Sequence, residues 1–283
     1  MKKISSLLVI GGDERRNSLC SQLTKHGYEV TDDEVFENEN VLFENITNFD
    51  AVVLPLPAST DGSHIYTRGK QRYSINRIID TLSKEQTVFA GKLSSAHRKK
   101  FEAAGVRVFD YFLLESVQIS NAVPTAQGVL KIVLDNIGYT VLSSSVAVTG
   151  FGKTAKAVAD VFDSLGACVT VFARSEKDLA TARARSLNAE KLRRLSARAG
   201  DFDIIVNTVP ALVVDGAVLG MAKKECLVID IASAPFGTDF SAASRMGIKA
   251  IQCPSLPGKV APVTAGIILA DGINSIIRGD GCE

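Results

Sequence analysis

The sequence predicts an α/β protein made of two open, doubly wound parallel-sheet domains. Its 283 residues provide room for about two hydrophobic cores. Short apolar runs recur between stretches of helical character, which is the rhythm of βα units. These runs are apolar without strict alternation, as expected for parallel strands that helices cover on both faces.

The first domain is expected over residues 1–123. Its strands are predicted at Leu7–Ile10, Ala51–Leu54, Thr87–Ala90 and Val106–Phe109. Each run is followed by polar or glycine-containing sequence, as at the end of a strand in an open sheet.

A linking helix is predicted for residues 124–144, after the start signal Val123-Pro124-Thr125. The second domain is expected over residues 145–261. Its strands are predicted at Val146–Thr149, Cys168–Phe172, Ile204–Asn207, Cys226–Asp230 and Lys249–Ile251. The final segment, 262–283, contains an apolar helix from about Pro262 to Ile277. We expect this helix to complete the first domain.

Composition excludes several classes of protein. Lys and Arg total 32 against 31 Asp and Glu, so there is no overall basic field to attract nucleic acid or an anionic membrane. No segment approaches the ~20 apolar residues of a membrane span, and Leu7–Ile10 is too short for the core of a signal peptide. The cysteines form no CxxC pair, which predicts reduced thiols in a soluble, cytoplasmic protein. They are Cys20, Cys168, Cys226, Cys253 and Cys282.

A GxGxxA motif follows the first strand of the second domain. Gly150 permits a tight turn, Gly152 lets the backbone approach a pyrophosphate, and Ala155 allows close packing of helix on strand. Lys153 and Thr154 lie at the start of the following helix, whose free N–H groups and positive dipole end face the phosphates. The motif predicts that the second domain is a Rossmann-type dinucleotide-binding domain.

The next strand ends in Ala173-Arg174-Ser175, where an NAD enzyme usually carries an acid for the ribose hydroxyls. An acid would repel a 2′-phosphate, whereas Arg174 can pair with it and Ser175 can donate a hydrogen bond. NADP is therefore favoured over NAD. The alternative is that Arg174 is a solvated arginine at a strand end.

Two later strand ends are expected to border the cofactor, because open α/β sheets bind ligands at the carboxyl ends of their strands. Ordinary loop chemistry is the alternative. The candidate residues are Asn207, Thr208, Val209, Pro210, Asp230 and Ala232.

Several segments together carry a resemblance to a known family. They are Ile10-Gly-Gly-Asp13-Glu-Arg15, Asn121-Ala-Val-Pro-Thr125-Ala-Gln127-Gly128, the Gly150 loop, Asn207-Thr-Val-Pro210, Asp230-Ile-Ala-Ser233, Gly237-Thr-Asp239-Phe240, and Leu256-Pro-Gly-Lys-Val-Ala-Pro262-Val-Thr-Ala-Gly266. Nearly end to end, the chain resembles the dipicolinate synthase A-subunit family of spore-forming bacteria.

The resemblance implies a last step of dipicolinate formation, in which a dihydrodipicolinate-like compound from the lysine pathway loses hydride to NADP. It also implies a flavoprotein-like partner, the B-subunit of dipicolinate synthase, and the mother-cell cytoplasm during sporulation. We also expect a homo-oligomer.

A substrate with two carboxylates needs fixed donors. The candidates are Arg15, Ser59, Thr60, Thr125 and Lys259. For Arg15 the alternative is a helix-capping cluster in which Asp13 serves the first turn. Ser59 and Thr60 could equally form only a turn, and Lys259 could be simply solvated.

A ring proton must leave as the hydride leaves, so a base or a water relay is expected. His64, in a loop, is the candidate base, although a lone loop histidine is more often only surface. His26 and His97 are expected to be structural, His26 at a helix end and His97 on a charged helical face. Lys259 and Gln127 complete the catalytic candidates. In the family that the chain resembles, an acid usually occupies the place of Gln127, and the neutral amide of Gln127 cannot itself act as a base.

Two other functions stay open from the sequence. One is a different two-domain NADP-dependent dehydrogenase, of the hydroxy-acid or folate type. The other is a regulatory subunit that senses NADP and transfers no hydride.

Overall fold

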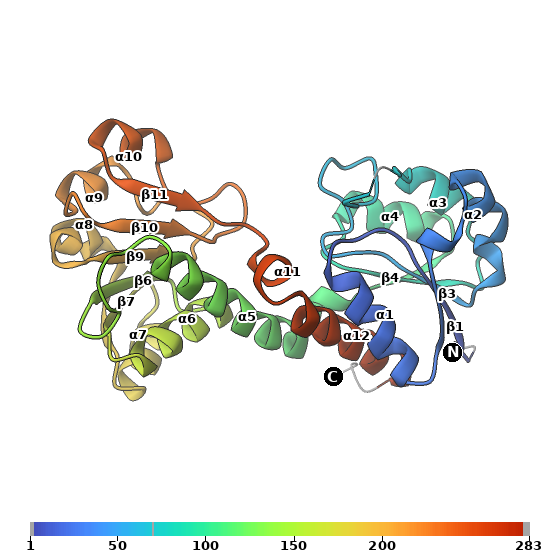
Figure 1. The fold of residues 1–283 in the computed structure, drawn as a ribbon, viewed down its shortest axis with the longest axis horizontal. Coiled ribbons are helices and arrows are strands. Elements are labelled where there is room, and N and C mark those ends of the chain that lie inside the picture. Colours follow the sequence, from blue (N-terminus) through green and yellow to red (C-terminus); the bar gives the residue numbers. More distant parts are fainter. Residues whose placement is uncertain (1–2, 70, 280–283) are drawn as a thin grey trace. The chain divides into compact units, whose positions relative to one another are not determined.

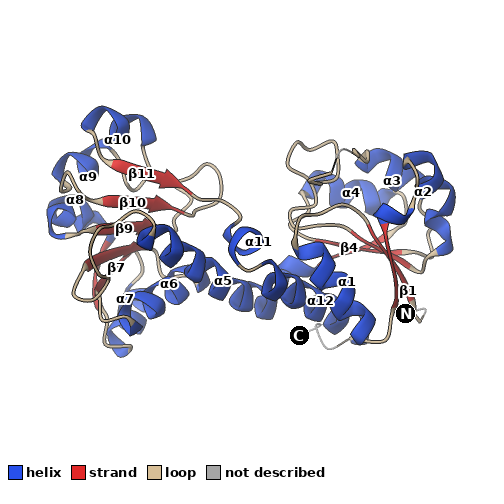
Figure 2. Cartoon of the chain, in the orientation of Figure 1, coloured by secondary structure: helices blue, strands red, loops and turns tan. Residues whose placement is uncertain are grey.

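The computed structural model describes residues 3–69 and 71–279 (Figure 1). Contacts divide the chain into two compact units, Met1–Asn121 with Ala261–Glu283 and Ala122–Val260. Each unit contains one open sheet of parallel strands with helices around it (Figure 2). The predicted fold class, two doubly wound parallel sheets, is therefore confirmed. Cys282 and the end of the predicted segment 262–283 lie outside the described residues.

The first unit has a five-stranded sheet in the order β2-β1-β3-β4-β5. Its strands are β1 Ser6–Val9, β2 Glu29–Asp32, β3 Ala51–Val53, β4 Thr87–Ala90 and β5 Arg107–Asp110. Its helices are α1 Arg15–Lys25, α2 Glu39–Asn45, α3 Ile75–Thr81, α4 Ser95–Ala103, the start of α5 Glu115–Leu134, and α12 Pro262–Arg278. The chain order of the strands reverses between β1 and β3, which is where open sheets of this kind present their ligand crevice.

The two faces of this sheet have separate cores because neighbouring strand residues point to opposite sides. Leu8 and Val52 pack with the helices α2, α3 and α4, whereas Leu7 and Val9 pack with α1 and α12. A Cβ atom at Gly266 of α12 would collide with the backbone of Arg15. Glycine therefore lets the C-terminal helix lie directly against the start of α1.

The second unit has a six-stranded sheet in the order β11-β10-β9-β6-β7-β8. Its strands are β6 Ser145–Thr149, β7 Cys168–Ala173, β8 Asn188–Lys191, β9 Ile204–Asn207, β10 Leu227–Asp230 and β11 Lys249–Gln252. Its further helices are α6 Lys153–Ser164, α7 Glu176–Ala184, α8 Leu195–Arg198, α9 Gly216–Met221, α10 Phe240–Met246 and α11 Leu256–Val260. Numbered within this unit the order is 3-2-1-4-5-6, the Rossmann order.

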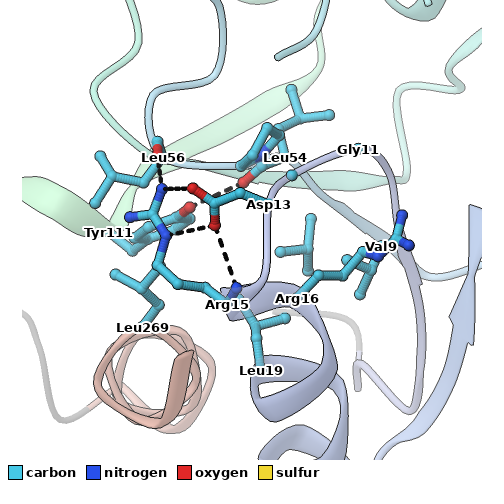
Figure 3. Close-up of a pocket in the computed structure, with 13 residues that line it drawn as sticks. Val9, Gly11, Asp13, Arg15, Arg16, Leu19, Leu54, Leu56, Tyr111 and Leu269 are labelled. Atoms are coloured by element: carbon cyan, nitrogen blue, oxygen red, sulfur yellow. Dashed lines mark hydrogen bonds and ion pairs between the residues drawn. The ribbon is translucent and has the colours of Figure 1, made fainter. Parts of the chain in front are cut away.

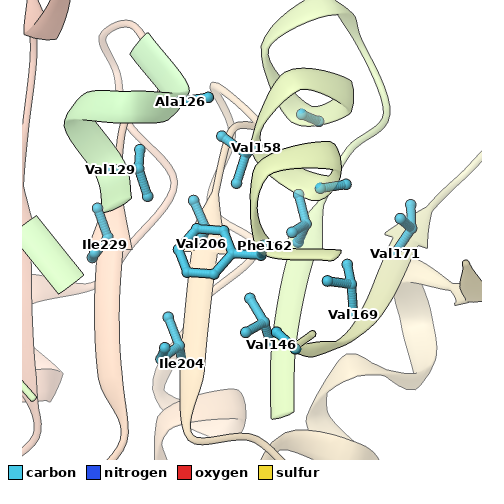
Figure 4. Packing of buried hydrophobic residues seen from close by; sticks show 14 of the residues in the cluster. Ala126, Val129, Val146, Val158, Phe162, Val169, Val171, Ile204, Val206 and Ile229 are labelled. Carbon is cyan, nitrogen blue, oxygen red and sulfur yellow. The ribbon is translucent and has the colours of Figure 1, made fainter. Parts of the chain in front are cut away.

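The core of the second unit fixes the glycine loop in place. Figure 4 shows the ring of Phe162 reaching from α6 onto Val146 and Val206 of two neighbouring strands, and these three residues are fully buried. Ala126 and Val129 of α5 belong to the same cluster. The first helix after β6 is therefore held on the sheet by packing along most of its length.

The linking helix differs from expectation, and two strands were missed. The linking helix, predicted for 124–144, is α5 Glu115–Leu134 and carries Pro124 in its interior. The missing N–H of Pro124 removes one backbone hydrogen bond, and the burial of Val117 and Val133 on the same helix outweighs that loss. Strands β2 and β8 were not predicted.

His97 also differs from expectation, because it lies inside the first unit rather than on a charged face. The residue is 7% exposed, and its ring nitrogens lie 2.9 Å from Ser94 Oγ and 3.0 Å from the carbonyl oxygen of Gly62. Within residues 3–69 and 71–279, none of the helices has the length and apolar character to cross a membrane.

Candidate functional site

The turn after β6 requires glycine at its first position. Gly150 has a φ of +82°, and a Cβ atom there would lie 2.8 Å from Thr208 Oγ1 and 3.1 Å from Val209 Cγ2. Both the left-handed backbone and the close approach of the loop after β9 exclude a side chain. The turn thus ends β6, and α6 starts three residues after Gly150, as the motif predicts.

Gly152 leaves open space at the N-terminus of α6. It is the N-cap residue, so no side-chain oxygen occupies the helix end, and nothing lies within 4 Å of where its Cβ would be. Ala155, fully buried, packs the first turn onto the sheet. Lys153 and Thr154 are half-buried beside it. The N-terminus of a helix with such a cradle suits the two charges of a pyrophosphate.

Side chains at the ends of β6 and β9 hold the neighbouring loop. Thr149 Oγ1 donates to Asn207 Oδ1 at 2.6 Å, and Asn207 Oδ1 also accepts from the N–H of Val209 at 3.1 Å. Thr208 Oγ1 donates to the carbonyl of Thr149 at 2.7 Å. Asn207 is fully buried, whereas Pro210 is exposed. Asn207 therefore positions the loop 208–210 beside the glycine turn.

Asp230 acts in the same way at the end of β10. Its fully buried carboxylate accepts the N–H groups of Ala232 and Gly237, each at 2.9 Å. A Cβ atom at Gly237 would collide with the Asn207 side chain and with the carbonyl of Val209. The loops after β9 and β10 thus pack on each other, and Asp230 shapes them through the backbone.

A cavity of about 200 Å³ opens at the end of β7. It is lined by Gly150, Phe172, Ala173, Arg174, Ser175, Asp178, Leu192 and Val209. The cavity joins the glycine turn to the Arg174-Ser175 pair, which are both exposed. Its position and lining fit the adenosine half of a dinucleotide whose pyrophosphate lies at the start of α6.

Charges of both signs surround this cavity. Ser175 caps α7, its Oγ accepting from the N–H of Asp178 at 3.0 Å. Lys191, the last residue of β8, lies with its Nζ 3.3 Å from the carbonyl oxygen of Arg174 and 2.5 Å from Glu176 Oε1. The hydrogen bond and the charge of Lys191 lower the pKa of Glu176. Lys191 and Leu192 were missed because strand β8 was not predicted.

Arg15, in the first unit, is held by the protein itself. Its guanidinium donates to Asp13 Oδ1 at 2.7 Å and Oδ2 at 2.8 Å, and to the carbonyl of Leu56 (Figure 3). Burial raises the pKa of Asp13, but the hydrogen bond and charge of Arg15 outweigh this and lower it. The Arg15 side chain is 8% exposed. Binding a substrate carboxylate would require it to exchange one of these partners.

His64 is fixed in its loop by an aspartate. Its Nδ1 lies 2.9 Å from Asp61 Oδ2, and the His64 side chain is 38% exposed. Hydrogen bonds from the backbone of His64 and Ser63 hold the pKa of Asp61 far below its usual range. A carboxylate on one ring nitrogen orients the imidazole and leaves Nε2 to accept a proton.

Ser59 and Thr60 belong to the same loop as His64. Ser59 Oγ accepts from the N–H of Gly62 at 2.9 Å and donates to Asp61 Oδ1 at 3.3 Å. Thr60 is exposed. The structure therefore gathers Ser59 and His64 around Asp61 in one turn.

The remaining candidates lie on α5 and α11 in the second unit. Gln127 and Lys259 are exposed, and Thr125 is half-buried. A Cβ atom at Gly128 would lie 3.0 Å from Leu256 Cβ, so the two helices pack closely. This packing places Gln127 and Lys259 on adjoining helices of one unit.

Comparison with known proteins agrees with this architecture. The family of the N-terminal domain of the dipicolinate synthase A-subunit matches residues 6–112. The dipicolinate synthase A-subunit of Bacillus subtilis is 32% identical over 286 residues, covering 96% of this chain and 95% of that protein. The crystal structure of the dipicolinate synthase A-subunit from Bacillus halodurans has 28% identity and a TM-score of 0.87, covering 96% of this chain and 97% of that chain.

A transhydrogenase from Sinorhizobium meliloti shares the fold, with a TM-score of 0.69 at 12% identity over 96% of this chain and 94% of that chain. Fold and site define the class: a two-unit α/β chain whose second unit has the Rossmann strand order, with a glycine turn of the dinucleotide-binding type after its first strand. Within that class, the chain belongs to the dipicolinate synthase A-subunit family.

Proposed function

We propose that the chain is an NADP-dependent dehydrogenase subunit that forms dipicolinate, pyridine-2,6-dicarboxylate, from a dihydrodipicolinate-type intermediate of the lysine pathway. The observation that carries the cofactor assignment is the cavity at the end of β7, where Arg174 and Ser175 lie beside the glycine turn. The relatives' name supplies the product. When bound, the nicotinamide accepts the hydride, and the substrate releases one proton as its ring becomes aromatic.

Each part of the second unit has a role in this proposal. Gly150, Gly152 and the first turn of α6 with Lys153, Thr154 and Ala155 hold the pyrophosphate. Arg174 binds the 2′-phosphate with a charge-assisted hydrogen bond, and Ser175 donates a second. The loop of Asn207, Thr208, Val209 and Pro210, with Asp230 and Ala232, shapes the nicotinamide side.

The ring proton of the substrate needs a base, and its two carboxylates need hydrogen-bond donors. His64, oriented by Asp61, is the proposed base, with its Nε2 taking the ring proton. Arg15, Ser59, Thr60, Thr125 and Lys259 are the proposed donors to the two carboxylates, and Gln127 the proposed hydrogen-bonding residue on α5. The proposed setting is the mother-cell cytoplasm of a sporulating bacterium, as a homo-oligomer with a flavoprotein-like B-subunit.

The reaction is tested with the purified chain, the B-subunit, the dihydrodipicolinate-type precursor and NADP. We expect NADPH and dipicolinate to appear in equal amounts. His64→Gln should lower the rate at saturating cofactor while cofactor affinity stays the same. Cofactor binding without hydride exchange, whether or not the B-subunit is present, would contradict the proposal and favour a sensing subunit. Oxidation of 2-hydroxy acids in place of the precursor would favour a different dehydrogenase.

A further inference from the structure

A second cation lies beside the cavity at the end of β7, in an ion pair. Lys191 Nζ is 2.5 Å from Glu176 Oε1, with the Lys191 side chain 32% exposed and that of Glu176 72% exposed. The same ammonium lies 3.3 Å from the carbonyl oxygen of Arg174, a residue that lines the cavity. The pair therefore lies at the rim of the proposed adenosine site.

The sheet register fixes where this lysine is. Lys191 is paired with Ala173 across the β7–β8 ladder, so it ends its strand level with the residue before Arg174. The carboxyl ends of parallel strands share one edge of the sheet. Leu192, the next residue, contributes to the cavity wall. Lys191 thus ends β8 directly before one lining residue of the cavity, with its ammonium at the carbonyl oxygen of another, Arg174.

Carboxylates in the first turn of α7 would repel a phosphate bound at the rim of the cavity. Glu176 and Asp178 both lie in that turn, where carboxylates are favoured by the helix dipole. Asp178 lines the cavity. Glu176 is paired with Lys191, so this carboxylate offsets the charge of the ammonium beside Arg174. Release of Lys191 from Glu176 would give a 2′-phosphate a second cation besides Arg174.

We infer that Lys191 is the second cation for the 2′-phosphate of NADP and that Glu176 binds this lysine when no phosphate is present. This rests on the proposed NADP-dependent function. A phosphate monoester carries about −1.5 to −2 charges at neutral pH and three acceptor oxygens, so it displaces a single exposed carboxylate from the ammonium. A nucleotide without the 2′-phosphate leaves the Glu176–Lys191 pair closed. The exchange therefore contributes to discrimination between the two cofactors.

The test is calorimetric binding of adenosine 2′,5′-bisphosphate and of 5′-AMP to the full chain. Lys191→Met should weaken binding of the bisphosphate about tenfold and change the affinity for 5′-AMP by less than about twofold. Glu176→Gln should tighten the bisphosphate several-fold, because the ammonium no longer has a competing partner. In the Lys191→Met background, Glu176→Gln should lose most of that effect. Lys177→Met, an exposed lysine of the same helical turn, is the matched control and should change neither.

Other results would overturn the inference. Unchanged bisphosphate affinity in Lys191→Met excludes contact with the phosphate. An equal gain from Glu176→Gln with or without Lys191 means that the glutamate only repels the phosphate through space. Arg174→Ala distinguishes failure of this inference from failure of the NADP proposal. If it abolishes a bisphosphate preference that Lys191→Met leaves intact, the inference fails and the NADP proposal stands. If the wild-type chain has no bisphosphate preference, both fail.

Discussion

The hydroxyl of Thr149, at the end of β6, donates a 2.6 Å hydrogen bond to the side-chain oxygen of Asn207, at the end of β9. These two strands lie side by side where the chain order of the second sheet reverses. Both side chains are fully buried. The bond therefore couples the glycine turn to the loop that begins at Thr208.

Thr149→Val removes this donor while keeping the shape of the side chain. We expect a loss of about 1–2 kcal/mol in the free energy of unfolding, since a buried hydrogen bond is lost, and weaker cofactor binding because the loop after β9 is less fixed. Thr149→Ser keeps the hydroxyl and should restore cofactor affinity. Denaturant unfolding and cofactor titration check both, and equal affinities for all three proteins would contradict the coupling.

The two glycines of the turn should respond differently to alanine. Gly150→Ala forces a Cβ against Thr208 and a left-handed backbone, so it should lower both stability, by about 1 kcal/mol or more, and cofactor affinity. Gly152→Ala meets open space, with φ −74°. Gly152→Ala should leave the stability near that of the wild type. It should still weaken cofactor binding, because the methyl group occupies space that the pyrophosphate needs. Thermal unfolding and cofactor titration of both variants check this distinction. A similar loss of stability in Gly150→Ala and Gly152→Ala would contradict it.

Arg15 is expected to contribute first to the stability of its own unit. Arg15→Met leaves the Asp13 carboxylate, 6% exposed, without its guanidinium, which typically costs about 3–5 kcal/mol. Adding Asp13→Asn should recover part of that loss. Denaturant unfolding measures both. Unchanged stability in Arg15→Met would contradict this structural role, whatever the variant does to the KM for the precursor.

Asp203 should make the second unit sensitive to acid. Burial raises its pKa, but hydrogen bonds from Lys223 Nζ at 2.6 Å and from the N–H of Ser145 at 2.9 Å outweigh burial and lower it below 3.8. A lowered pKa in the folded state gives stability above the unfolded value that is lost as the pH falls through the folded value. Asp203→Asn should lower the free energy of unfolding by roughly 1 kcal/mol or less at neutral pH.

The sign of the effect is checked by following unfolding from pH 7 down to about pH 3. The difference between wild type and Asp203→Asn should shrink toward zero at the acid end. Asp163→Asn, at an exposed position of α6, is the control. A difference that grows as the pH falls would contradict the assignment.

The interior strands could be predicted because burial on both faces leaves a clear sequence pattern. Val146, Val148 and Ile205 belong to such runs, and the glycine turn follows from Gly150 and Gly152 alone. Of the four edge strands, β5 and β11 were predicted, whereas β2 and β8 could not be predicted in this way. Their residues are exposed or half-buried, so Glu29–Asp32 and Asn188–Lys191 read as polar loops.

The candidate site could likewise be predicted only in part. Arg174 follows an interior strand and could be found from its spacing to Gly150. Lys191 lies next to it only through the β7–β8 ladder, which the sequence pattern does not reveal. The partners of Arg15 and His97 likewise come from tertiary packing: Leu56 and Gly62 accept their hydrogen bonds across long sequence separations.

The central claim is tested most directly by calorimetric titration of NADPH and NADH into the wild-type chain and Arg174→Ala, with Lys249→Ala, exposed on the far edge strand β11, as the charge control. We predict that the wild-type chain and the control bind NADPH at least about tenfold more tightly than NADH. Arg174→Ala should lose most of this preference while keeping its affinity for NADH. Equal affinities for the two cofactors in the wild-type chain, or equal losses in Arg174→Ala, would contradict it.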